Sequence, residues 1–432
     1  PRFIYQKTKK MKKITNIIFI LFLLGMFFSC SSSQNTTNRN VAGIYMPGIN
    51  LLDPDMLAFH TNDTLTEFHF RINSANILYT KKREDSTFSA NVKVTYELYE
   101  LDSKTLLDSA SLNFVDYGNN KEKKFLDGIF MLNTLFGKIY TVKVTFNDLN
   151  RDQYIKKSLV LDKATIYNPQ NYLVLDESQN ITFKNYLKNN STFYLKKNES
   201  IVDTTFVLKY YKSDFPIAKP PFSSNETSEE KMTFLPEFTE ELTFDSLQQL
   251  SYEVTENGLY FIHPEGQSIG PTLFNFQDNF PEVKTAENMI PPMRYITTSK
   301  EFEQLISAEN PKLEVDKFWK DVAGSNDRAR TLIREYFKRV ESANNYFTSY
   351  MEGWKTDRGI IYIIFGVPNV VYKHKNYENW IYGEENNMMS LSFVFHKVAS
   401  PITDNDFVLS RSPVFKNNWF RAVDSWRSGR IY

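Results

Sequence analysis

The residues best suited to chemistry lie in one heptapeptide, GWKTDRG, at positions 353–359. An aromatic face beside a carboxylate is common in sugar-binding sites, and binding residues concentrate on loops that a rigid scaffold holds. In this interpretation Trp354 is a stacking platform, and Asp357 with Arg358 orients a ligand. The residues that we select as a binding or structural motif are Gly353, Trp354, Thr356, Asp357, Arg358, Gly359 and Trp380.

Catalysis by this heptapeptide would require a second carboxylate. Glycoside hydrolysis places two carboxylates about 5–9.5 Å apart, on either side of one bond. Glu352 and Glu378 are near Asp357 in the sequence, but their distances in space do not follow from this spacing. We therefore assign no catalytic residue.

A structural interpretation accounts for the same residues. Gly353 would end the preceding helix in the left-handed conformation, and residues 356–359 would form a tight turn in which Gly359 supplies a positive φ. Trp354 would pack over this helix-to-strand corner. Arg358 would pair with the adjacent carboxylate, with a helix carboxylate or with the carbonyl groups at the helix end. The choice between binding and structure depends on whether the corner faces solvent.

The C-terminal part of the chain resembles the GWxTD-domain proteins of Bacteroidetes and related bacteria. The heptapeptide carries the resemblance, with support from FWK at 318–320, IIYIIFGVP at 360–368 and ENWIY at 378–382. The match covers roughly residues 300–432. It implies an exported and often lipidated protein with β-rich regions before the domain, and it implies no particular activity.

The N-terminal residues predict export and a lipid anchor. MKKITNIIFILFLLGMFFSC starts at Met11 with two lysines nearby, continues with a short apolar run and ends at Cys30, which is the layout of a secretory signal peptide. Cys30 is the only cysteine, so it cannot form an internal disulfide. The stretch resembles a bacterial lipobox, in which this cysteine is acylated, although Phe27 and Phe28 replace the usual Leu and small residue.

The residues after Cys30 indicate which way the anchored protein faces. Residues 31–40 are polar and lack hydrophobic periodicity, so they predict a flexible tether. They contain no acidic residue, whereas the surface-export signals of Bacteroidetes-type lipoproteins are acidic there. We therefore expect a lipid-anchored outer-membrane protein that faces the periplasm.

Composition and spacing exclude several classes of function. The 51 Lys+Arg balance the 51 Asp+Glu, so the chain lacks the basic excess typical of nucleic-acid binding. No two histidines have metal-ligand spacing, and a zinc site would need more cysteines or paired histidines. The chain has no GxSxG elbow, phosphate-cradling loop or dinucleotide fingerprint. We therefore predict no metal, no cofactor and no nucleic-acid partner.

Two strand-rich regions are expected to precede the motif. Apolar residues alternate with polar ones in NVKVTYELYEL and GKIYTVKVTFND, which predicts half-buried strands. Short strands separated by turn residues indicate a β-sandwich over residues 41–163. NYLVLD, STFYLKK, TTFVLKYY and NGLYFIH indicate a second sandwich over residues 164–293. Residues 1–30, which we call the leader, then comprise upstream residues and the lipoprotein signal peptide, and residues 31–40 are the flexible tether.

Residues 294–432 have a different pattern. Apolar residues at helical spacing predict a long amphipathic helix that begins after Ser325 or Asn326. They are Leu332, Tyr336, Val340, Ala343 and Phe347. IIYIIF, ENWIY, MSLSFVFHK and DFVLSR predict strands. The expected fold class is mainly β with α+β: two tandem Ig-like β-sandwich domains, then an α+β domain with a long helix packed on a small antiparallel sheet.

These observations favour a non-catalytic role. We expect a lipid-anchored accessory, scaffold or binding subunit of an outer-membrane assembly, with protein partners in the envelope and the membrane bound through the N-terminal lipid. The alternative is an envelope glycan-binding protein or glycan hydrolase that uses residues 353–359.

Overall fold

The computed structural model describes residues 40–46, 52–81, 87–101, 103, 105–118, 123–223 and 235–432. The predicted leader, Cys30 and nearly all of the predicted tether therefore lie outside the described residues. No helix in the described ranges is long and apolar enough to cross a membrane.

The first sandwich consists of two antiparallel sheets with strand orders β1-β2-β5 and β4-β3-β6-β7. Their inward-facing apolar side chains share one core. The strands are β1 (Asp55–His60), β2 (Leu65–Asn73), β3 (Ser89–Glu100), β4 (Leu106–Tyr117), β5 (Phe125–Asn133), β6 (Ile139–Asp148) and β7 (Gln153–Asp162), with the 3-10 turn η3 (Ser74–Asn76) between β2 and β3.

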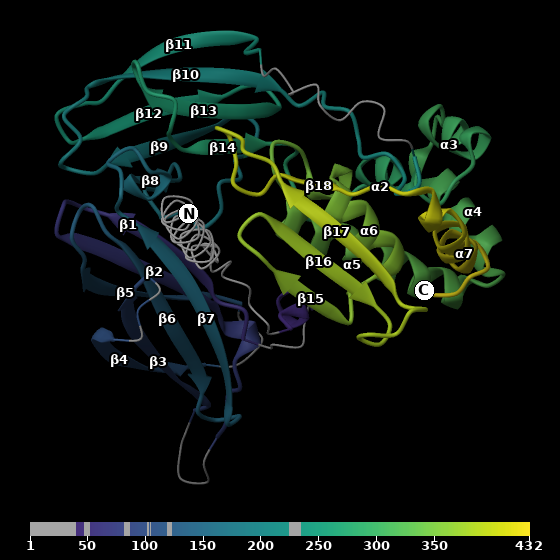
Figure 1. Ribbon diagram of the computed structural model, residues 1–432, viewed down its shortest axis with the longest axis horizontal. Helices are drawn as coiled ribbons and strands as arrows, with labels where there is room; N and C mark the ends of the chain where they lie inside the picture. The colour runs from purple at the N-terminus through teal and green to yellow at the C-terminus, as the bar shows by residue number, and fades with distance from the viewer. Residues whose placement is uncertain are drawn as a thin grey trace, which may run out of the picture.

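The second sandwich repeats this strand order, with sheets β8-β9-β12 and β11-β10-β13-β14 around a separate core. It follows the 3-10 turn η4 (Pro169–Asn171). Its strands are β8 (Tyr172–Leu175), β9 (Ser191–Lys197), β10 (Thr205–Lys212), β11 (Phe238–Thr243), β12 (Gln249–Val254), β13 (Gly258–Pro264) and β14 (Thr272–Asn275). The two sandwiches lie one above the other on the left of Figure 1.

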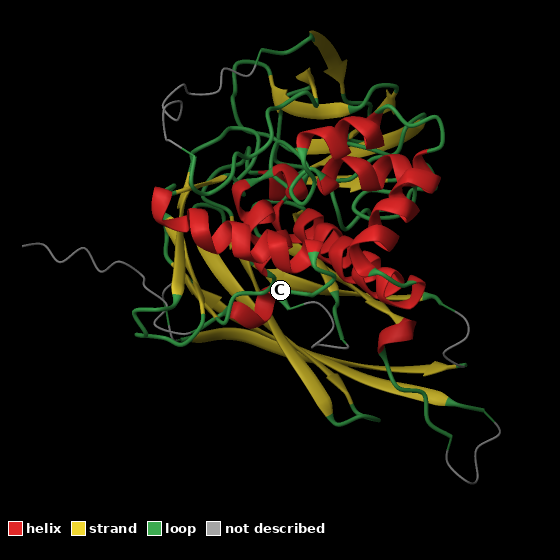
Figure 2. Ribbon diagram, turned by 90° about the vertical axis from the view of Figure 1, so that its right-hand side faces the viewer, coloured by secondary structure: helices red, strands yellow, loops and turns green. Residues whose placement is uncertain are grey.

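The C-terminal domain packs helices on one antiparallel sheet of order β15-β16-β17-β18, and Figure 2 shows the helices gathered in one layer. The helices are α2 (Ala286–Met293), α3 (Ser299–Ile306), α4 (Pro311–Ala323), α5 (Asn326–Phe347), α6 (Asp357–Phe365) and α7 (Lys416–Arg427), with 3-10 turns η5 (Gly353–Lys355) and η6 (Pro413–Phe415). The strands are β15 (Val370–Lys373), β16 (Tyr377–Tyr382), β17 (Leu391–Lys397) and β18 (Phe407–Leu409). The predicted fold class is confirmed.

The long helix predicted after residue 325 is α5, and the Ser325 side chain caps it by accepting a hydrogen bond from the Arg328 amide. The predicted strand IIYIIF is wrong, because these residues belong to helix α6. All nine residues of α6 are buried. A helix buried on every side shows no polar face, so its short apolar run has the same pattern as a buried strand. The heptapeptide therefore joins two helices, not a helix and a strand.

Several contacts tie the C-terminal domain to earlier parts of the chain, and two of them involve its neighbours β13 and η2. The outward side chains Leu259 and Phe261 of β13 are buried and share a cluster with Ile402. Near the N-terminus, the 3-10 turn η2 (Ala42–Tyr45) lies beside β15 (Figure 1), and the Val41 amide donates to the Val371 carbonyl. The first described residues thus pack on the last domain.

Candidate functional site

The heptapeptide forms a closed corner between α5 and α6. The Thr356 hydroxyl donates to the Gly353 carbonyl (2.8 Å) and accepts from the Gly359 amide (3.1 Å), which caps α6. The Gly353 amide donates to the Thr348 hydroxyl (3.1 Å), and the Trp354 amide donates to Asn344 Oδ1 (3.1 Å). Side chains at the end of α5 therefore satisfy the backbone of the corner.

Close approach of backbones explains both glycines of the motif. A Cβ at Gly359 would lie 1.8 Å from the Gly353 carbonyl oxygen, and one at Gly353 would lie 1.9 Å from that of Ala343. Neither glycine is among the residues with positive φ. The prediction of left-handed glycines is therefore wrong: these positions need glycine because there is no space for a side chain.

The two motif tryptophans are buried. Trp354 is 8% exposed, and the Tyr295 hydroxyl donates to its carbonyl at 3.0 Å. Trp380 is fully buried, and its Nε1 donates to Glu378 Oε2 at 3.0 Å. Stacking on a sugar requires an accessible ring face, so the burial of both rings supports packing rather than a glycan groove.

Asp357 is the first residue of α6, and its side chain points into the domain. It forms an ion pair with Arg411 and accepts a hydrogen bond from the Leu409 amide at 2.8 Å. Burial raises the pKa of Asp357, and Arg411 opposes that shift. The carboxylate thus joins α6 to the strand β18, and it is not positioned to reach a solvent-borne substrate.

Arg358 does not pair with Asp357 or with a carboxylate on α5, so the predicted partners are wrong. Its guanidinium pairs with Glu378 (3.3 Å) and donates to the Asn405 carbonyl (3.0 Å). The guanidinium carbon lies 4.0 Å from the ring centroid of Phe407, in cation–π geometry. The adjacent residues 357 and 358 point to different partners because successive helix positions lie about 100° apart.

Glu378 is the centre of a buried polar cluster that sequence analysis considered only as a catalytic candidate. Besides Arg358 and Trp380, it binds Lys373 Nζ (3.1 Å) and the hydroxyl of Tyr45 (2.9 Å). Burial acts to raise the pKa of Glu378, but Arg358 and Lys373 outweigh it and hold that pKa below its usual value. The side chain therefore stays ionised and fully occupied by donors.

Glu352, the remaining candidate carboxylate, pairs with Lys355 at 2.7 Å. Among the residues that the structure describes, no group of three or more His, Cys, Asp or Glu could hold a metal ion. Each carboxylate of the candidate set thus has a cationic partner, which is an arrangement for holding structure rather than for proton transfer.

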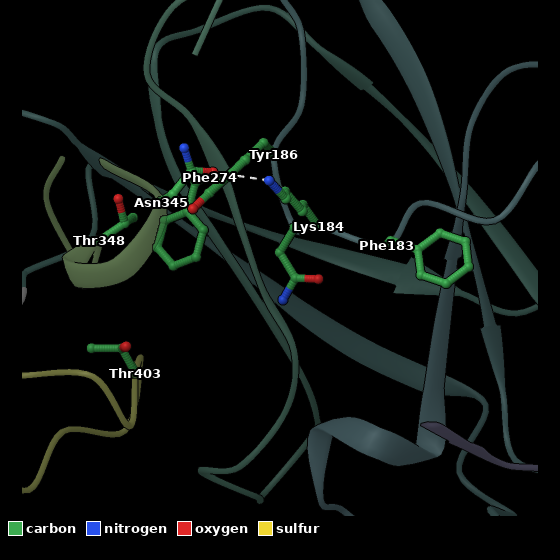
Figure 3. A pocket seen from close by; sticks show the side chains of 8 residues that line it. Phe183, Lys184, Tyr186, Phe274, Asn345, Thr348 and Thr403 are labelled. Carbon is green, nitrogen blue, oxygen red and sulfur yellow. Dashed lines mark hydrogen bonds between the residues drawn. The ribbon is translucent and has the colours of Figure 1, made fainter. Parts of the chain in front are cut away.

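A cleft lies next to the motif, between the second sandwich and the C-terminal domain, and we call it the motif-side cleft (Figure 3). Its volume is about 290 Å³. Lys184 Nζ crosses it to Asn345 Oδ1 at 2.9 Å. The lining residues are Phe183, Lys184, Asn185, Tyr186, Phe274, Asn345, Thr348 and Thr403. None of these residues was singled out from the sequence, since they meet only in the folded chain.

Comparison with known proteins identifies one part of the chain. Residues 258–428 match the family model of the GWxTD domain, which begins in β13 of the second sandwich and includes the whole C-terminal helix layer. A search of curated proteins finds no match.

Solved structures resemble the chain only distantly. A β-glucuronidase of Bacteroides uniformis is 12% identical over 28% of this chain and 14% of its own, with a TM-score of 0.18. A red sea bream transglutaminase is 9% identical over 52% of this chain and 31% of its own, with a TM-score of 0.20. The major pilin subunit of Bacillus cereus is 10% identical over 50% of this chain and 59% of its own, with a TM-score of 0.16. The chain spans less than two thirds of each, and these likenesses carry no functional argument.

Proposed function

The chain is a GWxTD domain-containing protein, and we propose that it is a non-catalytic scaffold or binding subunit of a cell-envelope assembly. In this proposal a lipid on Cys30 holds it at the outer membrane, facing the periplasm. Two observations together carry the proposal. The motif side chains bind other parts of the same chain, and apolar side chains of the first sandwich are exposed to solvent.

The motif helps to fasten the second sandwich to the C-terminal domain. The Ala218 amide, in the crossover after β10, donates to the Lys355 carbonyl at 2.8 Å. Arg411, the partner of Asp357, also donates to the Lys219 carbonyl at 3.3 Å. Domains fastened together in this way suit a platform for other proteins, because less conformational freedom is lost when a partner binds.

The first sandwich carries an apolar row on its edge strand β5. Phe125, Ile129 and Met131 point to the outer face and are 59%, 44% and 48% exposed. Edge strands with exposed apolar side chains favour pairing with another protein. We propose this β5 row as the contact for a protein partner in the envelope.

The test is the size of the detergent-extracted native protein. We expect wild type to migrate in native gels as a complex larger than the single chain, and the double variant Ile129→Asp and Met131→Asp to migrate as a single chain. Val202→Asp, at an 88% exposed position of the second sandwich, is the matched control and should keep the complex. A wild-type protein extracted only as a single chain would contradict the proposal.

The anchor is tested separately by Cys30→Ser. This variant should lose acylation and appear in the soluble fraction, because a single signal-peptide cysteine is the only proposed attachment point. Retention of Cys30→Ser in the membrane fraction would refute the lipid anchor and leave the scaffold proposal to the native-gel result.

A second candidate is glycan binding, and the motif-side cleft favours it. Phe183 and Tyr186 supply aromatic groups there, while Asn185 and Asn345 supply amides, a mixture that suits hydroxyl-rich ligands. Calorimetry with soluble envelope glycan fragments tests it, using Asn345→Ala as the variant. Equal heats for the wild type and the variant, or none at all, would reject this candidate.

A further inference from the structure

Residues Asn40–Met46, which we call the strap, occupy a groove of the C-terminal domain beside the edge strand β15. The Val41 amide donates to the Val371 carbonyl at 2.9 Å. Asn40 Oδ1 accepts from the Val371 amide at 3.0 Å, and Asn40 Nδ2 donates to the Asn369 carbonyl at 3.0 Å. The Asn40 side chain thus pairs with β15 as a backbone peptide group would, and the strap extends the sheet.

Tyr45 inserts its ring into the domain and is 3% exposed. Its ring centroid lies 5.6, 5.0 and 5.2 Å from those of Tyr346, Phe347 and Trp380. Its carbonyl accepts a hydrogen bond from the Tyr362 hydroxyl at 2.7 Å. An aromatic pocket of this depth binds a ring through apolar burial and favourable ring edges.

The floor of this pocket is charged. The Tyr45 hydroxyl lies 2.9 and 3.1 Å from the two carboxylate oxygens of Glu378. Lys373 Nζ lies 4.9 Å from the Tyr45 ring centroid and also binds Glu378. Arg358 of the motif binds the same carboxylate. The motif therefore helps to orient a buried acceptor that selects a phenol over a phenyl ring, since a hydrogen bond to an ionised group is strong.

The strap relates to this groove as a ligand relates to its receptor. Its hydrogen bonds and ring contacts with other described parts of the chain go to the C-terminal domain. Only a few residues of the strap contact the groove closely: Asn40 pairs with the edge strand, and Ala42 and Tyr45 are buried. Gly43 and Ile44 face solvent. Recognition by so few residues of a short segment does not depend on the segment being in the same chain.

We propose that this groove is a receptor for the strap sequence, filled in cis by the chain's own Asn40–Met46 and able to take the strap of a second copy in trans. Exchange of an identical element is a low-cost route to a dimer, because each contact is replaced by the same contact. This proposal concerns self-association of the purified chain and does not depend on the proposed envelope partner.

The first test uses a fluorescent peptide of residues 38–47 and the full chain carrying Tyr45→Ala. The emptied pocket should bind this peptide at least tenfold more tightly than wild type does, because the wild-type pocket is occupied by a tethered competitor. A peptide with Tyr45→Phe should bind the variant several-fold more weakly. If the Tyr45→Ala chain does not fold, Asn40→Ala, which loosens the strap and leaves the pocket intact, replaces it.

The second test mixes two variants with complementary defects. The Tyr45→Ala chain has an empty pocket and no tyrosine to donate, whereas a Glu378→Gln chain keeps its tyrosine but has a weakened pocket. Sedimentation velocity should show a one-to-one dimer in the mixture and no dimer in either variant alone. Folded variants that do not bind the peptide, or peptide binding without the mixed dimer, would overturn the proposal.

Discussion

The two sandwiches have the same strand order, but they face different surroundings. In the first, the outward positions of β6 are Thr141, Lys143 and Thr145, which face solvent as expected for a half-buried strand. In the second, the corresponding strand β13 has Leu259 and Phe261 outward, and both are buried against the C-terminal domain.

This difference shows how one fold serves two purposes. A strand covered on one face alternates apolar and polar residues, whereas a strand covered on both faces is apolar throughout. GLYFIHP in β13 is such a run apart from His263, and all seven of its residues are buried. The second sandwich therefore supports the C-terminal domain. The first packs on the second through β1 and keeps the outer faces of β5 and β6 for other molecules. Three experiments can break or sharpen this comparison.

The largest effect is expected from Gly359→Val. A side chain there would collide with the Gly353 carbonyl, which lies 1.8 Å from the ideal Cβ position, so we expect a loss of more than about 3 kcal/mol in the free energy of unfolding. Hydrogen exchange should show lost protection in β13, β14 and the C-terminal domain, with β1–β7 still protected. Gly43→Ala, where a Cβ meets nothing within 4 Å, is the control. Equal loss in both sandwiches would show that they are not independent.

A smaller effect is expected from Phe261→Ala, which removes a ring buried between the second sandwich and the C-terminal domain. Truncation of a buried Phe costs about 3 kcal/mol or slightly more. Lys143→Ala, at an outward position of β6, should change the free energy of unfolding by less than about 0.5 kcal/mol. Urea unfolding measures both. Similar values for the two variants would contradict the claim that the outer face of β13 is covered and that of β6 is not.

The smallest effect concerns pH. Burial and the neighbouring Asp357 raise the pKa of Asp406 to about 6, above its value of about 3.9 in an unfolded chain. Because the folded state then holds a proton that the unfolded state releases, stability falls as the pH rises from about 4 to about 6. Asp406→Asn should flatten this slope and gain about 1–2 kcal/mol at neutral pH.

Thermal unfolding at pH 4 and pH 7.5 tests this third prediction. The melting temperatures of wild type and Asp406→Asn should differ least at pH 4, where the folded forms of both carry a neutral side chain at position 406. If the stability of the variant falls with rising pH as steeply as that of wild type, Asp406 is not the group that causes the pH dependence.

The spacing of apolar residues correctly predicted elements that have one solvent-exposed face. The α5 residues Leu332, Tyr336, Val340, Ala343 and Phe347 are all buried, as their spacing indicates. The same spacing gave a wrong prediction for α6, which has no solvent-exposed face. The shorter helices α2, α3 and α4 were not predicted, although the capping box of Thr298 and Glu301 and the Asn310-Pro311 start were present in the sequence.

The motif was found from its residue types, but its partners were not. Arg411 and Asn405 lie more than 40 residues from the motif side chains that they bind. Pairings at such separations depend on the tertiary fold, and local pattern carries no signal for them. Tyr45 was missed for the same reason. A single aromatic residue after a polar tether forms no repeating pattern, so the sequence does not predict that it is buried in a distant domain.

The strap also has a consequence for the time course of folding. Its tyrosine contacts Tyr362 and Glu378 across separations of 317 and 333 residues. Contacts this distant in sequence form late, because the intervening chain must be ordered first. During synthesis the strap is made early, yet its groove is complete only after β15 and β16 exist. Docking of Tyr45 therefore reports that the chain has been made and folded at least as far as Glu378.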